Sequence, residues 1–495
     1  MKGALLNSCV ALTALASCAG AASVDQPQRR WNQNLVNADE LMAKIKLKDL
    51  MAGAQKLQSF ADKYPAKNRV FGEAAHKDTV DWLYNELKAL RYYDVKKEEQ
   101  KQLWSRSEAT LTAGDKKVDV RAMTYSPSGT VSGDFSVVKN LGCKAEDYAG
   151  VSGKIALISR GECSFAEKAL AAGSSKAIGA VVYNNVPGEL GGTLGGADDR
   201  YVPTVGISQA DGQDIISRVG SGSVSGHLWV DTKMENRTTW NVIAQTKGGD
   251  SHNVVMLGSH SDSVDAGPGI NDNGSGSIGI LAIAKALTQF KVKNAVRFGW
   301  WTAEEFGLLG SEYYVANLPE KEIAKLRLYL NFDMIASPNY VNGIYDGDGS
   351  TYNTTGPAGS AEIEHLFQKF FDDQGLPHQP TEFDGRSDYD AFIQKKIPAG
   401  GIFTGAEKVK SAKEAKLYGG EAGVPYDVNY HAKGDDVKNL NKNAFLVNTR
   451  GAAYAIAEYA SSLRGFPPRE KSTKRDEVRP WRGHNGDCTH RDCTW

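Results

Sequence analysis

Apolar and polar positions divide the chain into helical and extended stretches. Residues 47–90 carry apolar side chains at roughly helical spacing, with a break at Tyr64-Pro65, so this stretch is predicted to be helical. Residues 94–120 have the pattern of strands. Further on, the mostly apolar runs 254–257, 296–301 and 328–332 predict buried strands, and the small-residue stretch 277–287 predicts a helix.

Each of the three buried strands is followed by side chains that could bind a metal ion. Neighbouring strands of an α/β fold end at the same edge of the sheet, so these side chains are expected to meet there. His260 and Asp262 follow the first strand and fall on the same side of an extended chain. Glu304 and Glu305 follow the second strand, and Asp333 follows the third.

Two loops add further candidates. A glycine-rich turn at 267–276 carries Asp272, and the polar loop 429–435 places His431 beside Tyr430. Imidazole and carboxylate groups suit zinc, and an Asp that accepts the other ring N–H of a His ligand fixes its tautomer. Two histidines and three carboxylates are enough for two zinc ions that share one bridging carboxylate. Taken singly, a carboxylate after a strand is usually a solvated cap and a lone His is usually structural; the joint pattern is what favours the metal site.

Several motifs resemble those of the co-catalytic dizinc aminopeptidases. They are Gly-Ser-His-Ser-Asp, Asn-Asp-Asn-Gly-Ser-Gly, Thr-Ala-Glu-Glu-Phe-Gly, Leu-Asn-Phe-Asp-Met and Tyr-His. More narrowly, residues 51–467 are similar to the secreted fungal leucine aminopeptidases that carry a protease-associated (PA) domain. The resemblance implies a three-layer α/β/α sandwich with a mixed central sheet, of the zinc exopeptidase type, plus an inserted, mostly β PA domain.

The resemblance also implies a role for each candidate residue. It gives one zinc ion to His260, Asp272 and Asp333, and the other to Asp272, Glu305 and His431. Asp262 would orient His260, Glu304 would act as general base, and Tyr430 would donate a hydrogen bond to the oxyanion. The family often has a cis peptide after its bridging Asp, so Asp272-Asn273 is expected to share it.

Three other segments look like family elements. Residues 153–184, with Gly-Glu-Cys-Ser-Phe at 161–165, look like part of a PA domain, which would cover the cleft or select substrates by size. A structural insertion without a ligand is an equally good interpretation. The loops 385–389 and 400–405 look like walls of the substrate pocket, and Arg386 could anchor an anionic or carbonyl group of the substrate; in a polar turn an Arg is more often a surface ion-pair partner.

Net charge and the absence of several motifs argue against other classes of function. A net charge of −1 gives no electrostatic case for binding nucleic acid or an anionic membrane. The chain has no GxSxG, HExxH or GxxxxGK[ST] motif, so serine hydrolases, thermolysin-like proteases and P-loop enzymes lack support.

The two ends and the cysteines indicate secretion. Lys2 followed by the apolar stretch 4–16 and small residues up to Ala22 predicts a signal peptide. Leu-Ala-Ser-Cys at 15–18 also resembles a bacterial lipoprotein box, an alternative disfavoured because the rest of the chain looks fungal. Arg29-Arg30 is a candidate processing site.

The cysteines also fit secretion. Cys9 and Cys18 would leave with the signal peptide, so four cysteines remain in the mature chain. The pairs Cys143–Cys163 and Cys488–Cys493 are suggested, although sequence does not fix connectivity. Sequons occur at Asn236 and Asn353 and, inside the metal loop, at Asn273, where a glycan would block the site.

These observations together predict a secreted zinc aminopeptidase. The expected divisions are a signal peptide (1–22), a propeptide (23–45), the first part of the peptidase domain (46–125), the PA domain (126–235), the dizinc catalytic domain (236–466) and a tail (467–495). Expected substrates are peptides with a free N-terminus and an apolar first residue such as Leu; a monomer is expected, with no nucleic-acid or membrane partner. The alternatives are a non-catalytic receptor or binding module on the same fold and, among enzymes, a carboxypeptidase or a glutaminyl cyclase.

Overall fold

The computed structural model describes residues 33–469. The predicted signal peptide, Arg29-Arg30, Cys488 and Cys493 lie outside the described residues. The fold set out below belongs to the compact unit that begins at Leu35. Within residues 33–469, no helix has both the length and the apolar character that a membrane span requires.

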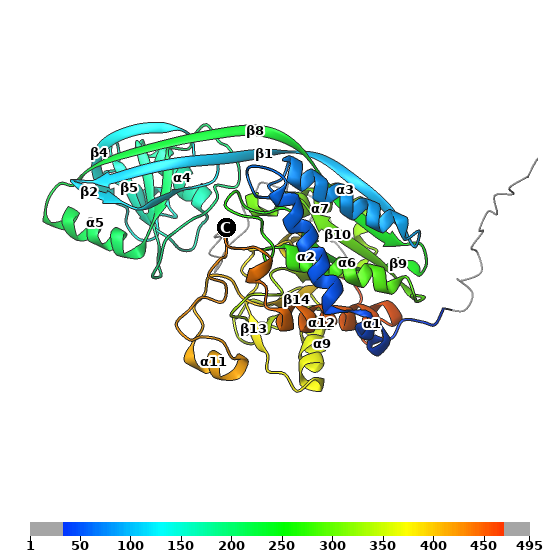
Figure 1. The fold of residues 1–495 in the computed structure, drawn as a ribbon. Coiled ribbons are helices and arrows are strands. Elements are labelled where there is room, and N and C mark those ends of the chain that lie inside the picture. The colour runs from blue at the N-terminus through cyan, green and yellow to red at the C-terminus, as the bar shows by residue number, and fades with distance from the viewer. Residues whose placement is uncertain (1–32, 470–495) are drawn as a thin grey trace, which may run out of the picture. The chain divides into compact units, whose positions relative to one another are not determined.

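A mixed sheet forms the centre of the catalytic part (Figure 1). Its parallel strands lie in the order β14 (Ala399–Phe403), β11 (Leu326–Phe332), β9 (Asp250–His260) and β10 (Asn294–Trp301). β8 (Ser225–Thr246) runs antiparallel to β10, and β12 (Gly343–Tyr345) runs antiparallel to β14 and parallel to β13 (Gln379–Thr381). The three predicted apolar runs all lie in these strands.

Alternation along the strands builds a core on each face of the sheet. On β9, Val255 and Leu257 belong to one core and Val254 and Met256 to the other, because successive side chains of a strand point to opposite faces. The first core includes residues of α1 (Ala38–Lys44), α2 (Leu47–Asp62), α3 (Ala74–Ala89), α6 (Gly274–Leu287), α9 (Ser360–Asp373) and α12 (Lys442–Ser461). The second includes residues of α7 (Leu309–Asn317), α8 (Glu320–Ile323) and α10 (Tyr389–Gln394). The predicted three-layer α/β/α arrangement is therefore confirmed.

The first described residues pack against this core. The predicted break at Tyr64-Pro65 separates α2 from α3. Val36, Leu41 and Ile45 are buried, and the Val36 N–H donates to the Lys291 carbonyl. Part of the segment expected to be a propeptide thus belongs to the folded core, so we propose that any processing occurs before Val36.

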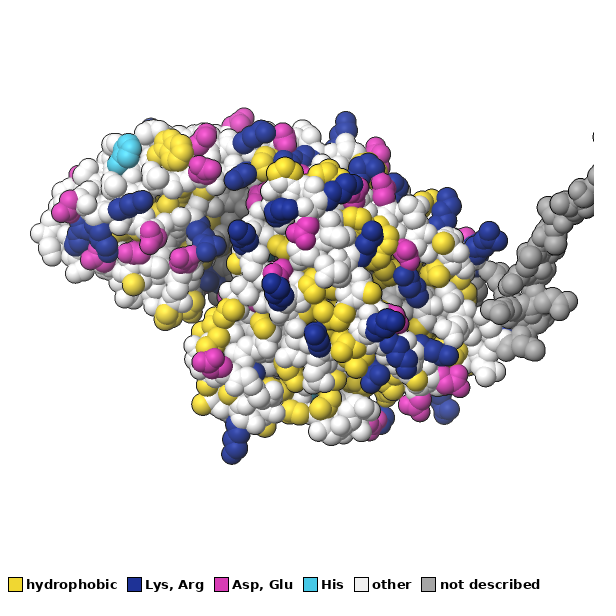
Figure 2. Space-filling view, viewed as in Figure 1, with side chains coloured by type: hydrophobic (Ala, Val, Ile, Leu, Met, Phe, Trp, Pro, Cys, Tyr) yellow, Lys and Arg dark blue, Asp and Glu magenta, His cyan; other side chains and the backbone are white. Residues whose placement is uncertain are grey.

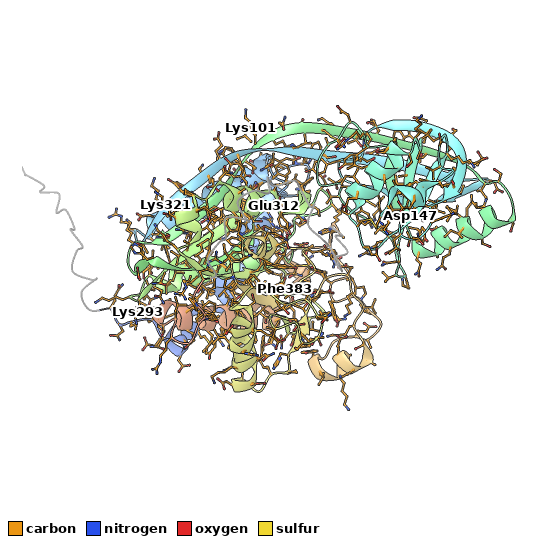
Figure 3. All side chains as sticks on the ribbon, turned by 180° about the vertical axis from the view of Figure 1, so that it is seen from behind. Lys101, Asp147, Lys293, Glu312, Lys321 and Phe383 are labelled. Carbon is orange, nitrogen blue, oxygen red and sulfur yellow. A yellow bond between two sulfur atoms is a disulfide. The ribbon has the colours of Figure 1, made fainter. Side chains whose placement is uncertain are left out.

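Two long antiparallel strands connect the catalytic sheet to the inserted domain. β1 (Tyr93–Ala113) pairs with β8 from Tyr93↔Thr246 to Ala113↔Gly226. One end of β8 pairs with β10, and the other end pairs with β4 (Gly129–Val137). Lys101, midway along β1, is exposed (Figure 3).

The strands of the inserted domain continue the same hydrogen-bonded sheet beyond β8 and β4, and the domain has its own cores. Its remaining strands are β2 (Lys116–Val118), β3 (Val120–Ala122), β5 (Ile155–Ser159), β6 (Gly179–Tyr183) and β7 (Thr204–Ile207), and its helices are α4 (Phe165–Ser174) and α5 (Gln209–Ser221). Cys143 and Cys163 form a disulfide, as suggested from the sequence. Beside it, the buried Lys168 ammonium donates to the Gly161 carbonyl at 2.9 Å.

The surface agrees with the balanced composition. On the face drawn in Figure 2, basic and acidic side chains are interspersed. The sequon residues Asn236 and Asn353 are exposed, whereas Asn273 is fully buried. A glycan could therefore reach the first two and not the third.

Candidate metal centre

The sheet topology brings the predicted site residues to one edge. After β9 the chain crosses through α6 to β10 on one side, and later returns to β11 on the other side of β9. Strand order reverses beside β9, and a crevice opens at such a point beyond the carboxyl ends of the strands. His260 is the last residue of β9, and Asp333 directly follows β11. Glu304 and Glu305 begin the short 3-10 helix η3 (Glu304–Phe306) just after β10.

Asp272 is held by the turn that leads into α6. The Asp272-Asn273 peptide bond is cis, as expected. Asn273 caps the helix, because its Oδ1 accepts from the Gly276 N–H at 3.0 Å, and its Nδ2 donates to the Phe332 carbonyl at 3.0 Å. A Cβ at Gly276 would lie 2.1 Å from that same carbonyl oxygen, so only glycine allows the helix to start this close to β11.

His431 comes from the loop after α11 (Ala412–Tyr418), and a carboxylate of the same loop supports the turn that carries Asp272. Asp435 is buried, and its two oxygens accept from the backbone N–H groups of Asn271 (2.8 Å) and Asp272 (2.9 Å). Nothing in the sequence assigns Asp435 this role. Its only signal was its position four residues after His431.

The five candidate ligands meet around Asp272, whose two oxygens face different histidines. His260 Nε2 lies 3.2 Å from Asp272 Oδ1 and 3.4 Å from Asp333 Oδ1. His431 Nε2 lies 3.2 Å from Asp272 Oδ2 and 3.0 Å from Glu305 Oε2. Compact groups of potential ligand atoms within 4.8 Å of one another also occur around His260, one with Glu304 and Asp333 and one with Asp272 and Glu305.

Two further observations indicate that this set of donors suits metal cations: buried atoms without hydrogen-bond partners, and the charge of the cluster. Several buried polar atoms of the cluster have no hydrogen-bond partner: both ring nitrogens of His260, Asp262 Oδ2, Glu305 Oε1 and Asp333 Oδ1. Such orphans are rare in folded proteins unless an ion satisfies them. Imidazole nitrogens and carboxylate oxygens are also the ligands that zinc accepts.

Charge in the cluster is the second observation. Burial raises the pKa of Glu305 to about 7, and the Asp272 carboxylate adds to the rise. Burial alone would lower the pKa of His431, yet the carboxylates of Glu305 and Asp272 raise it to about 10. The buried carboxylates therefore draw positive charge onto the histidines, and divalent cations would supply that charge instead.

Asp262 and Glu304 flank the ligands. Asp262 Oδ1 lies 3.5 Å from His260 Nδ1 and accepts from the Glu304 N–H at 3.2 Å. Glu304 is buried, with its Oε2 3.8 Å from His260 Nε2. Burial, together with the Asp333, Asp388 and Glu305 carboxylates, raises the pKa of Glu304 well above its usual value, although His260 opposes the rise.

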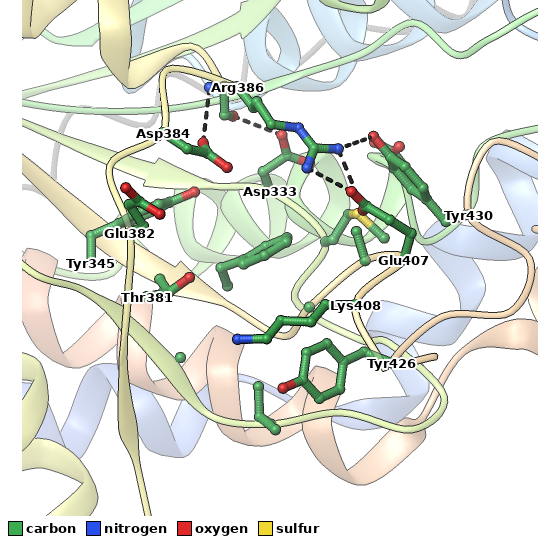
Figure 4. Close-up of a pocket in the computed structure, with 18 of the residues that line it drawn as sticks. Asp333, Tyr345, Thr381, Glu382, Asp384, Arg386, Glu407, Lys408, Tyr426 and Tyr430 are labelled. Atoms are coloured by element: carbon green, nitrogen blue, oxygen red, sulfur yellow. Dashed lines mark hydrogen bonds and ion pairs between the residues drawn. The ribbon is translucent and has the colours of Figure 1, made fainter. Parts of the chain in front are cut away.

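Arg386 and Tyr430 form one network at the cavity wall (Figure 4). Arg386 Nη1 pairs with Glu407 Oε1 at 2.8 Å, and Nη2 donates to the Tyr430 hydroxyl oxygen at 3.0 Å. The Tyr430 ring stacks on the His431 ring with centroids 3.9 Å apart. Ser387 donates to Asp333 Oδ2 at 2.7 Å. The loop 385–389 therefore reaches both the candidate ligand Asp333 and the cavity, as expected for a pocket wall.

Four of the candidate ligands, Asp272, Glu305, Asp333 and His431, line a cavity of about 200 Å³. Its wall away from the ligands includes apolar and aromatic side chains: Met334, Val341, Tyr345, Phe403 and Tyr426. All of its lining residues lie between Asp272 and His431, so none comes from the inserted domain. The expected covering or selecting role of that domain stays a prediction.

Comparison with known proteins agrees with this geometry. The Peptidase family M28 model matches residues 241–456, and the PA domain model matches residues 131–215. The chain is 64% identical to leucine aminopeptidase 2 of Arthroderma otae over 99% of each chain. It is 62% identical to leucine aminopeptidase 2 of Trichophyton rubrum over 96% of each chain, and 58% identical to a probable leucine aminopeptidase 2 of Aspergillus oryzae over 89% of each.

Solved structures show the same fold. The aminopeptidase from Aneurinibacillus sp. strain AM-1 superposes with a TM-score of 0.71 at 28% identity, over 86% of this chain and 96% of that one. BSAP, a zinc aminopeptidase from Bacillus subtilis, gives a TM-score of 0.61 at 24% identity over 84% and 96%, which supports the fold alone.

Proposed function

Since the chain belongs to peptidase family M28 and is an aminopeptidase, we propose that it depends on zinc, binds two zinc ions and releases apolar N-terminal residues, Leu among them, with Glu304 as general base. We also propose that it acts as a secreted monomer. The alternative of a non-catalytic binding module is not favoured, because Glu304 and four of the candidate ligands line one cavity and the fifth, His260, contacts Asp272 behind them.

One observation carries the proposal of two ions. Asp272 Oδ1 faces His260, and Asp272 Oδ2 faces His431, each at 3.2 Å. A carboxylate whose two oxygens each meet a different imidazole is arranged to bridge two cations. His260 and Asp333 would complete one zinc site, and Glu305 and His431 the other.

The chain's own residues supply the proton chemistry. Bound at these positions, zinc would polarise the scissile carbonyl and lower the pKa of a shared water. Glu304 would take a proton from that water and return it to the leaving amine. Arg386 donates to the Tyr430 oxygen, so the Tyr430 hydrogen is free to point into the cavity and stabilise the oxyanion.

The cavity supports an apolar first residue. Its apolar and aromatic wall can take the side chain of that residue, while the carboxylates of Glu304 and Asp333 lie where the cationic amine would bind. Arg386 already pairs with Glu407, so we propose that it positions Tyr430 as well as contacting the substrate.

Metal counting tests this proposal. Protein dialysed against buffered zinc and analysed by plasma mass spectrometry should contain two zinc ions per chain. His431→Ala should retain about one, and Asp272→Ala should retain less than one, since a single carboxylate serves both ions. A wild-type protein that saturates at one zinc while fully active would overturn the dizinc proposal.

A further inference from the structure

Arg69, which lies between α2 and α3, is a buried cation beside the metal-binding turn. Its side chain is fully buried, and all four of its hydrogen bonds go to backbone carbonyls. Nε donates to Pro268 at 2.8 Å, Nη2 to Gly269 at 2.5 Å and, more weakly, to Asp262 at 3.5 Å. Nη1 donates to Ser261.

These carbonyls belong to the two ends of one loop. Ser261 and Asp262 directly follow His260, and Pro268 and Gly269 precede Asp272 by four and three residues. One planar guanidinium therefore holds together the segment after His260 and the turn that leads to Asp272. The Arg69 N–H also donates to Ser263 Oγ at 2.8 Å, so backbone and side chain grip the same loop.

The charge of Arg69 makes this arrangement costly without a function. Burial lowers its pKa to about 10, although Asp262, Asp435, Glu305 and Asp272 oppose the fall, so the group is still cationic at neutral pH. A buried cation stabilises a fold poorly, because lost hydration offsets what its contacts contribute. A guanidinium that donates to four carbonyls does, however, hold the backbone in one position, and a metal centre needs such support to keep its ligands in place.

His76 of α3 makes a second contact with the same loop. Its Nε2 lies 3.0 Å from Ser261 Oγ, and that hydroxyl donates to the Trp301 carbonyl at 2.8 Å. Since the hydroxyl proton is used, the ring Nε2–H is the donor to Ser261. Burial lowers the pKa of His76 to about 4, which keeps the ring neutral at neutral pH. His76 thereby holds the Ser261 hydroxyl, whose own bond to the Trp301 carbonyl ties the chain just after β9 to the end of β10, which leads to Glu304 and Glu305.

We propose that Arg69, supported by His76, is a positioning residue of the metal centre: it fixes His260 and Asp272 relative to each other, so that zinc affinity depends on it. The inference rests on the proposed dizinc function. Neither residue is among those that line the cavity. Loss of the clamp should therefore weaken zinc binding and leave the apolar wall of the substrate site unchanged.

The test compares Arg69→Lys with Arg327→Lys. Arg327 is a half-buried Arg at the amino end of β11, away from Asp333, and it donates to the Pro467 carbonyl and to Asn253. Zinc occupancy of each protein is measured against free zinc set by a competing chelator, with the melting temperature of the chelated form recorded alongside. R69K should need about 10- to 100-fold more free zinc for half occupancy, the usual range for losing support behind a metal ligand. R327K should lose thermal stability and shift half occupancy by less than about 2-fold.

Kinetics separates positioning from general destabilisation. At saturating zinc, R69K should recover most of its kcat and show an unchanged KM for Leu substrates. A folded R69K with wild-type zinc affinity, beside a wild-type protein that binds two zinc ions, would overturn the clamp alone; a wild-type protein that binds fewer than two would overturn the dizinc proposal instead.

A second variant decides the matter if R69K does not fold. His76→Phe keeps the volume of the ring and removes the hydrogen bond to Ser261. It should raise the free zinc needed for half occupancy at least about 5-fold. Wild-type zinc affinity in H76F would then overturn the proposal.

Discussion

Glu304 and Glu305, which follow one another just after β10, face different histidines. Ala303 has φ of 55°, and this left-handed turn leads from the strand into η3. Glu304 Oε2 consequently lies 3.8 Å from His260, while Glu305 Oε2 lies 3.0 Å from His431. Two neighbouring carboxylates can therefore divide the tasks of base and ligand.

Glu304→Gln tests that division. Gln has nearly the same shape but cannot accept a proton from water at working pH. We expect kcat to fall at least ~100-fold, the scale for losing a general base, with zinc content and melting temperature preserved. Glu305→Gln is the matched control and should lose zinc. Loss of zinc from E304Q, with zinc kept in E305Q, would mean that the two roles are exchanged.

Glu312 of α7, labelled in Figure 3, is a carboxyl group whose charged form the fold disfavours. Burial raises its pKa to about 8, and the nearby carboxylates of Asp390 and Asp388 add to the rise. Because the folded pKa exceeds that of the unfolded chain, folding takes up a proton between about pH 4.5 and pH 8. Stability contributed by this group is therefore present at acidic pH and lost as pH rises.

Glu312→Gln should remove this dependence. We expect the same melting temperature as wild type near pH 4.5 and a higher one at pH 8, with a gain of up to about 4 kcal/mol in the free energy of unfolding, since one unit of pKa shift corresponds to about 1.4 kcal/mol. Thermal or urea unfolding of both proteins across this range measures the difference. A difference that shrinks as pH rises would show that Glu312 is ionised and satisfied in the fold.

At the scale of elements, the start of α6 makes the sequon at Asn273 inaccessible to glycosylation. Asn273 is buried, and both of its side-chain groups are used, by Gly276 and Phe332. We expect peptide mapping of protein secreted from a eukaryotic host to find glycans at Asn236 and Asn353 and none at Asn273. Enzymatic deglycosylation in water labelled with a heavy oxygen isotope marks each occupied Asn, and mass spectrometry identifies it. A glycan at Asn273 would contradict the buried cap.

The sequence predicted the buried strands and the meeting of the candidate ligands, because both follow from local patterns. The apolar runs before His260 and Asp333 mark strands by their composition, and the motifs around Asp272 and His431 resemble a known family. Arg69 and Asp435 were missed because their roles are backbone contacts made across about 160 to 200 residues of sequence. No periodicity or motif shows which carbonyl a distant side chain reaches.

At the scale of the whole molecule, charge around the cavity indicates which end of a peptide is bound. Seven acidic residues line it, against the basic residues Arg386 and Lys408. Arg386 already pairs with Glu407 and donates to Tyr430, and Lys408 is exposed. A carboxypeptidase would need a buried cationic clamp for the substrate carboxylate. The excess of carboxylates instead favours the cationic amine of a free N-terminus.

A short peptide beginning with Leu and its N-acetylated twin distinguish these cases. The free peptide should lose residues from its N-terminus, because its amine can pair with the cavity carboxylates. Acetylation removes the positive charge of the amine and adds bulk at the position where the amine would bind, so the acetylated peptide should not be cleaved. Mass spectrometry of timed samples reads the products, and chelator-treated protein serves as the control for contaminating peptidases. Residues lost from the C-terminus, or equal cleavage of both peptides, would contradict an amine-binding site at the metal centre.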